Sequence, residues 1–331
     1  MLYKLLLHMD RDRFCNTVLS LTDMGSVTVK IEELGVTVEA LGLRRGLPDP
    51  SGIWKLRKVI SKHKPDIIQT WMYHADLIGG LAAKWAGKFP VIWNIRHSNL
   101  DFKEDKKTTI LTAKACARLS HILPEQIVCC SESSRQVHAG MGYDFQKMHV
   151  IPNGFNLNQF KPNSQARESF RRELGVSNKA LTVGTVARFH PQKDHHNFVL
   201  AAQRIVESVD DVYFILCGKD IGRHNETLLA LIQETGLEDC FFLLGSRNDV
   251  PRMTAAFDIA CLSSAFGEGF PNVLGEAMAC GVPCVATDVG DSADIVGDTG
   301  FVVPPSDPNA LAEALKKMIH LGDKGRTHLG K

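Results

Sequence analysis

The sequence predicts an α/β protein made of two parallel-sheet domains that face each other across a cleft. Short apolar runs rich in strand-forming residues alternate with stretches of helical periodicity along the whole chain. This is the pattern of parallel strands joined by crossover helices. A polar segment at 156–178, which contains Pro162, Asn163 and Ser164, divides the pattern into two series, and 331 residues is a length suited to two domains.

The first series forms a domain at 1–155, in which apolar runs predict strands near 15–21, 38–42, 66–71, 90–96 and 126–131, with helices near 2–9, 53–62, 77–86 and 108–123. After the linker at 156–178, the second series forms a domain at 179–331. Its predicted strands lie near 181–187, 212–218, 241–245, 258–263, 283–287 and 301–303, and its helices near 194–207, 224–235, 248–256, 271–280 and 308–320. Ligands of open parallel sheets bind beyond the carboxyl ends of the strands, so the loops that follow strands are the places to search.

Composition excludes several classes of partner. The 38 basic residues nearly cancel the 37 acidic ones, so no strong global field draws the chain onto nucleic acid or an anionic membrane. Most of the nine cysteines lie in apolar runs, which favours a reducing, cytoplasmic location. No apolar run approaches the roughly 20 residues that span a bilayer. Lys and Arg on one face of 108–123 leave peripheral contact with the inner face of a membrane open, although such a face is more often simply solvated.

The most informative segment is Phe266-Gly-Glu-Gly-Phe-Pro-Asn-Val-Leu-Gly-Glu, which follows an apolar strand. Its glycines allow the backbone to approach a ligand closely, and Pro271 suits the first turn of a helix. Free amides at the start of that helix, together with the helix dipole, form a site for a diphosphate, and they belong to Asn272, Val273 and Leu274. Glu268 in the loop and Glu276 within the helix flank this site.

Two cations follow the first strand of the second domain. Arg188 offers a planar fork of donors and Lys193 a compact charge, a suitable pair for a diphosphate. An exposed cation pair in a turn is the alternative. No Asp-x-Asp stands in a loop suited to a metal-bridged diphosphate, so no metal and no cofactor are expected to be required.

The spacing of Glu268 and Glu276 resembles the Glu-x7-Glu motif of retaining glycosyltransferases with the GT-B fold, in particular family 4, which is built from two Rossmann-like domains. The resemblance implies that Glu268 contacts hydroxyls of the transferred sugar and that Glu276 hydrogen-bonds the nucleotide ribose. It also implies that Arg188 and Lys193 clamp the donor phosphates within a motif that is typically Gly-Arg-x4-Lys-Gly. Here Ala187 and Asp194 replace the two glycines, and both cations remain.

The same resemblance extends to other strand ends. Val150-Ile-Pro-Asn-Gly154 matches a turn at the end of the first domain and serves as a hinge marker. His97, after the strand at 90–96, is a candidate for contacting the reacting centre, or else is structural; Arg96 and Asn99 could hold an acceptor or a phosphate, and His74 is a weaker candidate. Arg247 and Asn248 are possible contacts to the nucleotide base. The predicted catalytic residues are Glu268, His97, Arg188 and Lys193, and the predicted donor-binding residues are Arg188, Lys193, Arg247, Asn248, Gly269, Phe270, Asn272, Val273, Leu274 and Glu276.

The resemblance implies a hexosyltransferase that moves a sugar from a UDP- or GDP-sugar to a hydroxyl of a glycan or lipid-linked acceptor, in polysaccharide or glycolipid synthesis. The first domain would bind the acceptor and the second the donor. Family members ordinarily carry a strand and a glycine-rich loop before the helix at 2–9 and further helices after 308–320, so we expect a chain truncated at both ends. Alternatives are a nucleotide-sugar-binding protein without turnover, or nucleotide-sugar hydrolysis or epimerisation.

Overall fold

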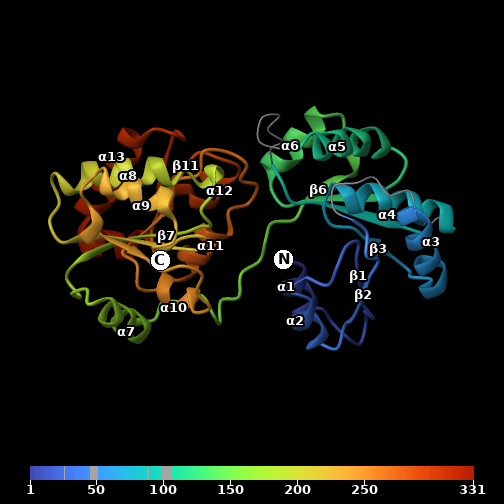
Figure 1. Cartoon of the computed structure of the whole chain (residues 1–331), viewed down its shortest axis with the longest axis horizontal. Coiled ribbons are helices and arrows are strands. Elements are labelled where there is room, and N and C mark those ends of the chain that lie inside the picture. Colours follow the sequence, from blue (N-terminus) through green and yellow to red (C-terminus); the bar gives the residue numbers. More distant parts are fainter. Residues whose placement is uncertain (26, 45–50, 88, 99–105) are drawn as a thin grey trace. The chain divides into compact units, whose positions relative to one another are not determined.

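The computed structural model describes residues 1–25, 27–44, 51–87, 89–98 and 106–331. Contacts between residues divide the chain into two compact units (Figure 1). Unit 1 comprises 1–96 and 100–153, and unit 2 comprises 97–99 and 154–331. No described helix is long and apolar enough to cross a membrane.

The described part of unit 1 contains two parallel sheets. Strand β1 (Thr17–Ser20) pairs with β2 (Thr37–Ala40), and a separate sheet has the order β3 (Ile68–Gln69), β4 (Val91–Ile95), β5 (Gln126–Cys129), β6 (Met148–Val150). The helices are α1 (Leu2–Leu7), α2 (Thr28–Glu32), α3 (Ser51–His63), α4 (Tyr73–Ala86), α5 (Lys107–Leu119) and α6 (Glu132–Gly140). Trp93, Ile95 and Ile127 are fully buried and pack with α4 and α5. The near-continuous apolar runs of β4 and β5 reflect a sheet that is covered on both faces.

One carboxyl group lies in the core of unit 1. Asp76, in the first turn of α4, is fully buried, and its Oδ1 accepts a hydrogen bond of 2.5 Å from the Thr70 hydroxyl. Its Oδ2 has no hydrogen-bond partner in the described part of the chain. Burial raises the pKa of Asp76 well above the usual carboxyl range, because a buried carboxylate lacks hydration. The folded protein therefore retains a proton that the unfolded chain releases.

We expect Asp76→Asn to change how the stability of unit 1 depends on pH. A carboxyl group whose pKa is higher in the folded than in the unfolded state contributes its full stabilisation below the unfolded-state pKa. This contribution is lost as the pH rises through the folded-state pKa. Asparagine keeps the acceptor for Thr70 and does not titrate, so the variant should gain stability relative to the original protein as pH rises from about 5 to about 8. All four tryptophans lie between residues 54 and 93, so tryptophan emission during urea unfolding reports on unit 1.

The matched control for this measurement is Asp66→Asn, which removes an exposed carboxylate from the same unit. Its difference in stability from the original protein should stay constant across the pH range. Parallel pH profiles for Asp76→Asn and the original protein would show that Asp76 titrates normally.

Unit 2 is one six-stranded parallel sheet with the order β12-β11-β10-β7-β8-β9. The strands are β7 (Leu181–Val186), β8 (Val212–Cys217), β9 (Phe241–Leu243), β10 (Ile259–Leu262), β11 (Cys284–Thr287) and β12 (Gly300–Val303). The chain runs outward from β7 to β9, returns to β10 on the other side of β7, and runs outward again. The reversal lies between β7 and β10, and such switch points are where ligands of open α/β sheets bind.

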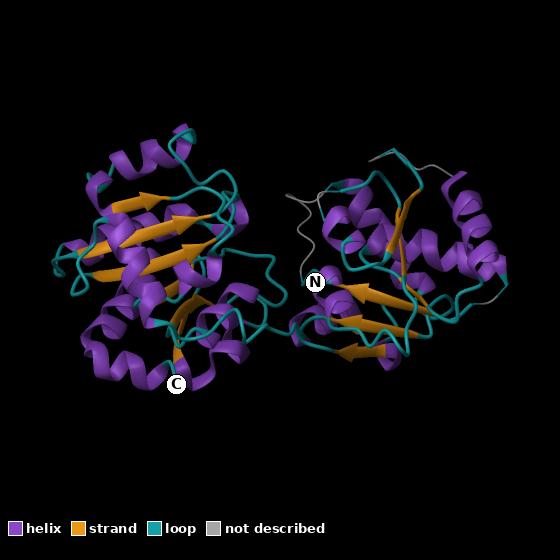
Figure 2. Cartoon of the chain, turned by 90° about the horizontal axis from the view of Figure 1, so that it is seen from below, coloured by secondary structure: helices purple, strands orange, loops and turns teal. Residues whose placement is uncertain are grey.

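Helices cover both faces of this sheet (Figure 1 and Figure 2). They are α7 (Ser164–Leu174), α8 (His195–Val206), α9 (Glu226–Gln233), α10 (Val250–Thr254), α11 (Asn272–Ala279), α12 (Ser292–Val296), α13 (Pro308–His320) and α14 (Gly322–Leu329). Strand β8 shows why both faces are apolar. Phe214 and Leu216 enter one core with α8 and α13, whereas Ile215 and Cys217 enter the other with α7, α10 and α11. Successive side chains of a strand point to opposite faces, so each face receives alternate residues.

The prediction of a linker at 156–178 is wrong for its second half. Helix α7 occupies 164–174; the Asn163 side chain caps it by accepting from the Ala166 amide at 2.9 Å, and Gly175 ends it with a φ of 71°. Phe170 is fully buried against the sheet of unit 2. The segment is polar because α7 has only a narrow apolar face. That face packs on the sheet of unit 2, so the segment is part of unit 2.

Candidate functional site

Three loops converge at the carboxyl ends of β7, β10 and β11. The loop after β10 donates from the Ala265 amide to the Gln192 carbonyl at 2.9 Å. The Ser263 hydroxyl donates to the Lys193 carbonyl at 2.8 Å, and the Thr287 hydroxyl to the Ser264 carbonyl at 2.6 Å. These bonds hold the predicted Arg188–Lys193 segment beside the predicted Glu268 loop, at the switch point of the sheet.

The Glu268 carboxylate is the centre of this arrangement. It is 7% exposed, and its Oε1 accepts a hydrogen bond from the Ser264 hydroxyl at 2.6 Å and forms an ion pair with the Lys193 ammonium. Two of the predicted catalytic residues, far apart in sequence, are therefore in direct contact. Ser264, which the sequence did not single out, orients the carboxylate. The pairing of the two charges compensates their burial.

A third loop closes on the backbone of Glu268. Gly290, at φ 65°, lies so near that an added Cβ would stand 2.3 Å from the Glu268 carbonyl oxygen and 2.7 Å from that of Gly269. The next residue, Asp291, donates its amide to the Gly269 carbonyl at 3.0 Å. Only glycine allows both this backbone conformation and this approach.

We expect Gly290→Ala to displace the Glu268 loop and to weaken binding of the predicted nucleotide-sugar donor by about tenfold or more, because the methyl group must displace backbone atoms and the left-handed conformation is strained. Isothermal titration with UDP measures the affinity. Gly297→Ala is the matched control, since that glycine also has a positive φ of 49° but its added Cβ would meet no atom within 4 Å. Equal affinities for the two variants would show that the Gly290 contact is dispensable.

Helix α11 begins beside this loop, with Pro271 immediately before its first residue rather than within its first turn. The Leu274 amide donates to the Pro271 carbonyl at 3.2 Å, so the prediction that this amide is free for a phosphate is wrong. Asn272 and Val273 remain the predicted phosphate-binding residues, and Glu276 lies partly exposed further along the helix.

The predicted donor residue Phe270 lies in an aromatic contact that the sequence did not reveal. The rings of Phe155 and Phe270 stack with centroids 6.1 Å apart. Phe155 also packs against α11, where a Cβ on Gly275 would stand 2.2 Å from its ring. Phe155 therefore contacts both the Phe270 end of the loop and helix α11.

Arg188 and Arg247 have different surroundings. Arg188 is exposed, and its guanidinium reaches the Gln192 side chain at 3.5 Å. Arg247 forms ion pairs with Asp249 at 2.7 Å and Glu173 at 3.0 Å, which lowers the pKa of Asp249 far below its usual range. These bonds tie Arg247 to α7 and not to the Lys193–Glu268 pair. Asn248 beside it is exposed.

Histidine occurs at two further positions of interest. His97 follows β4 of unit 1, but its contacts group it with unit 2. Its contact with a reacting sugar stays a prediction. His195, the first residue of α8, is 3% exposed, and neither of its ring nitrogens has a hydrogen-bond partner in the described part of the chain. Burial, and then the nearby charge of Lys193, lower the pKa of His195 to about 4. Its ring is neutral at pH 7 and adds no charge beside Lys193.

Arg96 lies at the carboxyl edge of the sheet in unit 1. Its guanidinium lies over the Trp71 ring at 4.7 Å and donates to the Asn153 side chain at 2.9 Å. His74 is exposed in the first turn of α4, and Asn99 lies outside the described residues.

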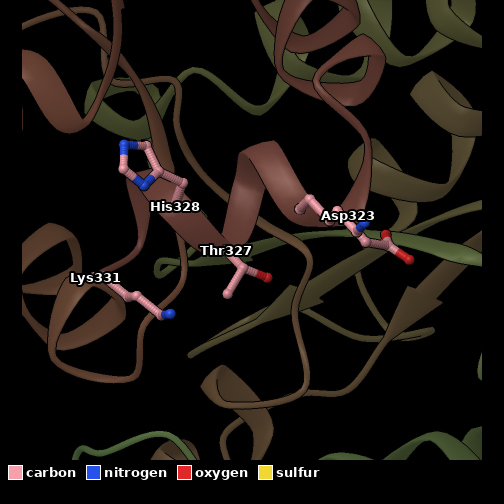
Figure 3. Close-up of a pocket in the computed structure, with 5 residues that line it drawn as sticks. Asp323, Thr327, His328 and Lys331 are labelled. Carbon is pink, nitrogen blue, oxygen red and sulfur yellow. The ribbon is translucent and has the colours of Figure 1, made fainter.

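A hollow of about 360 Å³ along α14 is separate from these residues (Figure 3). It is lined by five exposed polar residues, namely Asp323, Lys324, Thr327, His328 and Lys331. Asp323 lies at one end of the helix and Lys331 beyond the other (Figure 3). No buried group faces this hollow, and we assign it no role. Across 1–25, 27–44, 51–87, 89–98 and 106–331, no three His, Cys, Asp or Glu residues cluster as metal ligands.

Comparison with known proteins identifies the family of the chain. The family described as "Glycosyl transferases group 1" matches residues 166–331, and "Glycosyltransferase Family 4" matches residues 3–159. An Escherichia coli enzyme named "UDP-Gal:alpha-D-GlcNAc-diphosphoundecaprenol alpha-1,3-galactosyltransferase" is 26% identical over 82% of this chain and 71% of its own. A Campylobacter jejuni enzyme named "N,N'-diacetylbacillosaminyl-diphospho-undecaprenol alpha-1,3-N-acetylgalactosaminyltransferase" is 25% identical over 92% of this chain and 82% of its own.

Solved structures show the same fold. Anabaena HepE in complex with UDP-glucose superimposes with a TM-score of 0.82 at 25% identity, covering 97% of this chain and 85% of that one. Sucrose-phosphate synthase from Thermosynechococcus elongatus superimposes with a TM-score of 0.76 at 20% identity, covering 95% and 92%. The chain therefore belongs to the glycosyl transferases group 1 family and is a glycosyltransferase with the GT-B fold typical of family 4.

Proposed function

We propose that this glycosyltransferase moves a hexosyl residue from a UDP-sugar to a hydroxyl of a lipid-linked glycan and retains the anomeric configuration. The observation that carries the proposal is the buried Glu268 carboxylate, held by Ser264 and Lys193 beside the start of α11. A carboxylate at this position can accept hydrogen bonds from sugar hydroxyls, while a cation and helix amides next to it suit a diphosphate.

The relatives support the choice of substrates. HepE, at 25% identity, has been solved with UDP-glucose, and the names of the two enzymes similar to this chain specify acceptors joined to diphospho-undecaprenol. Retention follows from the resemblance of the Glu268–Glu276 spacing to the family motif. Because such acceptors are carried on a lipid, we propose that the reaction takes place at the cytoplasmic face of a membrane.

Each residue of the site has a distinct part in the proposed reaction. The bond between the anomeric carbon and the phosphate oxygen breaks, and its electron pair stays on the leaving diphosphate. The acceptor hydroxyl oxygen bonds to the anomeric carbon, and the hydroxyl proton passes to the leaving diphosphate. Lys193, Arg188 and the amides of Asn272 and Val273 stabilise that growing negative charge. Glu268 holds hydroxyls of the sugar while its ring becomes oxocarbenium-like, and Glu276 accepts from the ribose. His97 contacts the reacting centre, and Arg247 and Asn248 lie on the side of the base.

The test is transfer from radiolabelled UDP-galactose, UDP-glucose and UDP-N-acetylgalactosamine to a polyprenyl-diphosphate-linked N-acetylglucosamine. We expect label in the lipid extract from at least one donor, removable by an α-glycosidase. Label released as free sugar without acceptor would indicate hydrolysis, and UDP binding without any turnover would indicate a binding protein. A β-linked product would overturn retention alone.

A further inference from the structure

Two exposed tryptophans lie on neighbouring helices of unit 1. Trp54 on α3 is 47% exposed and Trp85 on α4 is 57% exposed. The two helices pack against each other (Figure 1). Indole side chains are among the largest apolar groups, and their exposure in pairs is a feature of surfaces that bind something.

Cations from α3 cover both rings. The Lys58 ammonium lies 3.6 Å from the centre of the Trp54 ring, and the Arg57 guanidinium lies 4.9 Å from that of Trp85. Because Arg57 reaches from α3 to a ring of α4, the two tryptophans belong to one continuous surface. We call this surface the basic-aromatic patch, and it consists of Trp54, Lys55, Arg57, Lys58, Lys62 and Trp85.

All charged residues of the basic-aromatic patch are cations. Helix α3 contains no acidic residue, and the only acidic residue of α4, Asp76, is fully buried. Trp54, Lys58 and Lys62 follow one another at intervals of one helical turn, opposite the buried Leu56 and Ile60. Residues spaced by four share a face of a helix, so these cations point away from the core. At the end of α3, His63 pairs with Glu39 and bounds the patch.

We infer that the basic-aromatic patch docks unit 1 onto an anionic lipid bilayer. Tryptophan prefers the headgroup level of a membrane, because its ring is apolar and its N–H remains polar. Lysine and arginine close to anionic headgroups each add attraction, and their long stems lie along the apolar surface. The inference rests on unit 1 alone and holds whichever sugar the enzyme transfers.

Helix α5 is the competing surface. It carries the exposed cations Lys107, Lys114 and Arg118 with the exposed Leu111, and the sequence drew attention to this face. It has no aromatic residue to enter the headgroup region. The indoles therefore favour the patch on α3 and α4 over the face of α5.

The first test is co-sedimentation of the full chain with vesicles. We expect binding to phosphatidylcholine mixed with phosphatidylglycerol, weak binding to phosphatidylcholine alone, and release by added salt. Lys55→Glu/Lys58→Glu should weaken binding to anionic vesicles by about tenfold or more. Lys317→Glu/Lys324→Glu makes the same change in net charge at exposed positions of unit 2 and should bind like the original protein.

Tryptophan emission supplies a second readout. Trp93 is fully buried and Trp71 is partly buried with Arg96 over its ring, so a blue shift upon addition of anionic vesicles should come from Trp54 and Trp85 and should vanish in Trp54→Phe/Trp85→Phe. Circular dichroism checks that every variant is folded. The inference is overturned if the original protein does not sediment with anionic vesicles, if the patch and control variants lose binding equally, or if only Lys107→Glu/Arg118→Glu on α5 loses it. Donor binding and sugar transfer in solution are measured separately, so failure here leaves the proposed reaction standing.

Discussion

Replacing Lys193 with methionine is expected to lower kcat for sugar transfer by about a hundredfold or more. Methionine keeps the length of the side chain and removes the charge. The variant loses the half-buried cation that pairs with Glu268 and, in the proposed reaction, its stabilisation of the leaving diphosphate. Initial rates at saturating UDP-sugar and acceptor give kcat directly. Lys317→Met, at an exposed position on α13, is the control and should transfer at the original rate.

The ion pair complicates this result, and a second variant separates the two effects. In Lys193→Met the buried Glu268 carboxylate loses its ion pair and keeps the hydrogen bond from the Ser264 hydroxyl. The free energy of unfolding is therefore expected to fall by about 1–3 kcal/mol. In Lys193→Met/Glu268→Gln no charge is left unpaired, so stability should largely return while transfer stays impaired. A kcat for Lys193→Met within about threefold of the original would remove Lys193 from the proposed mechanism.

The sheet of unit 2 was predictable because its strands are short apolar runs between loops of small and polar residues. All six predicted strands are present, and they form one sheet. In unit 1 the five predicted strands are also present, but β1 and β2 pair only with each other in the part of the chain that the structure describes. Pairing depends on which strands meet in space, and periodicity carries no information about that.

The candidate site was predictable as a set of residues but not as a set of contacts. Lys193 and Glu268 were each singled out from a local motif, whereas their ion pair depends on β10 lying beside β7. Ser264 and Phe155 had no distinguishing motif. Gly290 lies in a segment that resembles the family. The sequence did not show that the Glu268 carbonyl packs against Gly290, where a Cβ would clash with it. Arg247 was predicted to contact the nucleotide base because its ion-pair partner Glu173 lies on α7, a helix that the sequence analysis assigned to a linker.

That helix also supplies the largest expected effect on stability. Asp258, at the start of β10, joins α7 to the sheet through four bonds. Its Oδ1 accepts from Arg167 at 2.6 Å, and its Oδ2 accepts from Arg171 at 3.2 Å and from the amide and hydroxyl of Thr182 at 2.8 and 3.0 Å. The Arg171 side chain is 1% exposed. A guanidinium this deeply buried depends on its carboxylate partner.

Asp258→Ala is therefore expected to lower the free energy of unfolding of unit 2 by about 3–5 kcal/mol, because it leaves the buried Arg171 charge unpaired. Unit 2 contains no tryptophan, so urea unfolding followed by far-ultraviolet circular dichroism should shift while tryptophan emission from unit 1 should not. Glu173→Ala, which removes a 39% exposed carboxylate from the same helix, should cost less than about 1 kcal/mol. Equally small effects of the two substitutions would mean that α7 is held on the sheet by the buried Phe170 and its apolar neighbours, and that the Asp258 bonds contribute little.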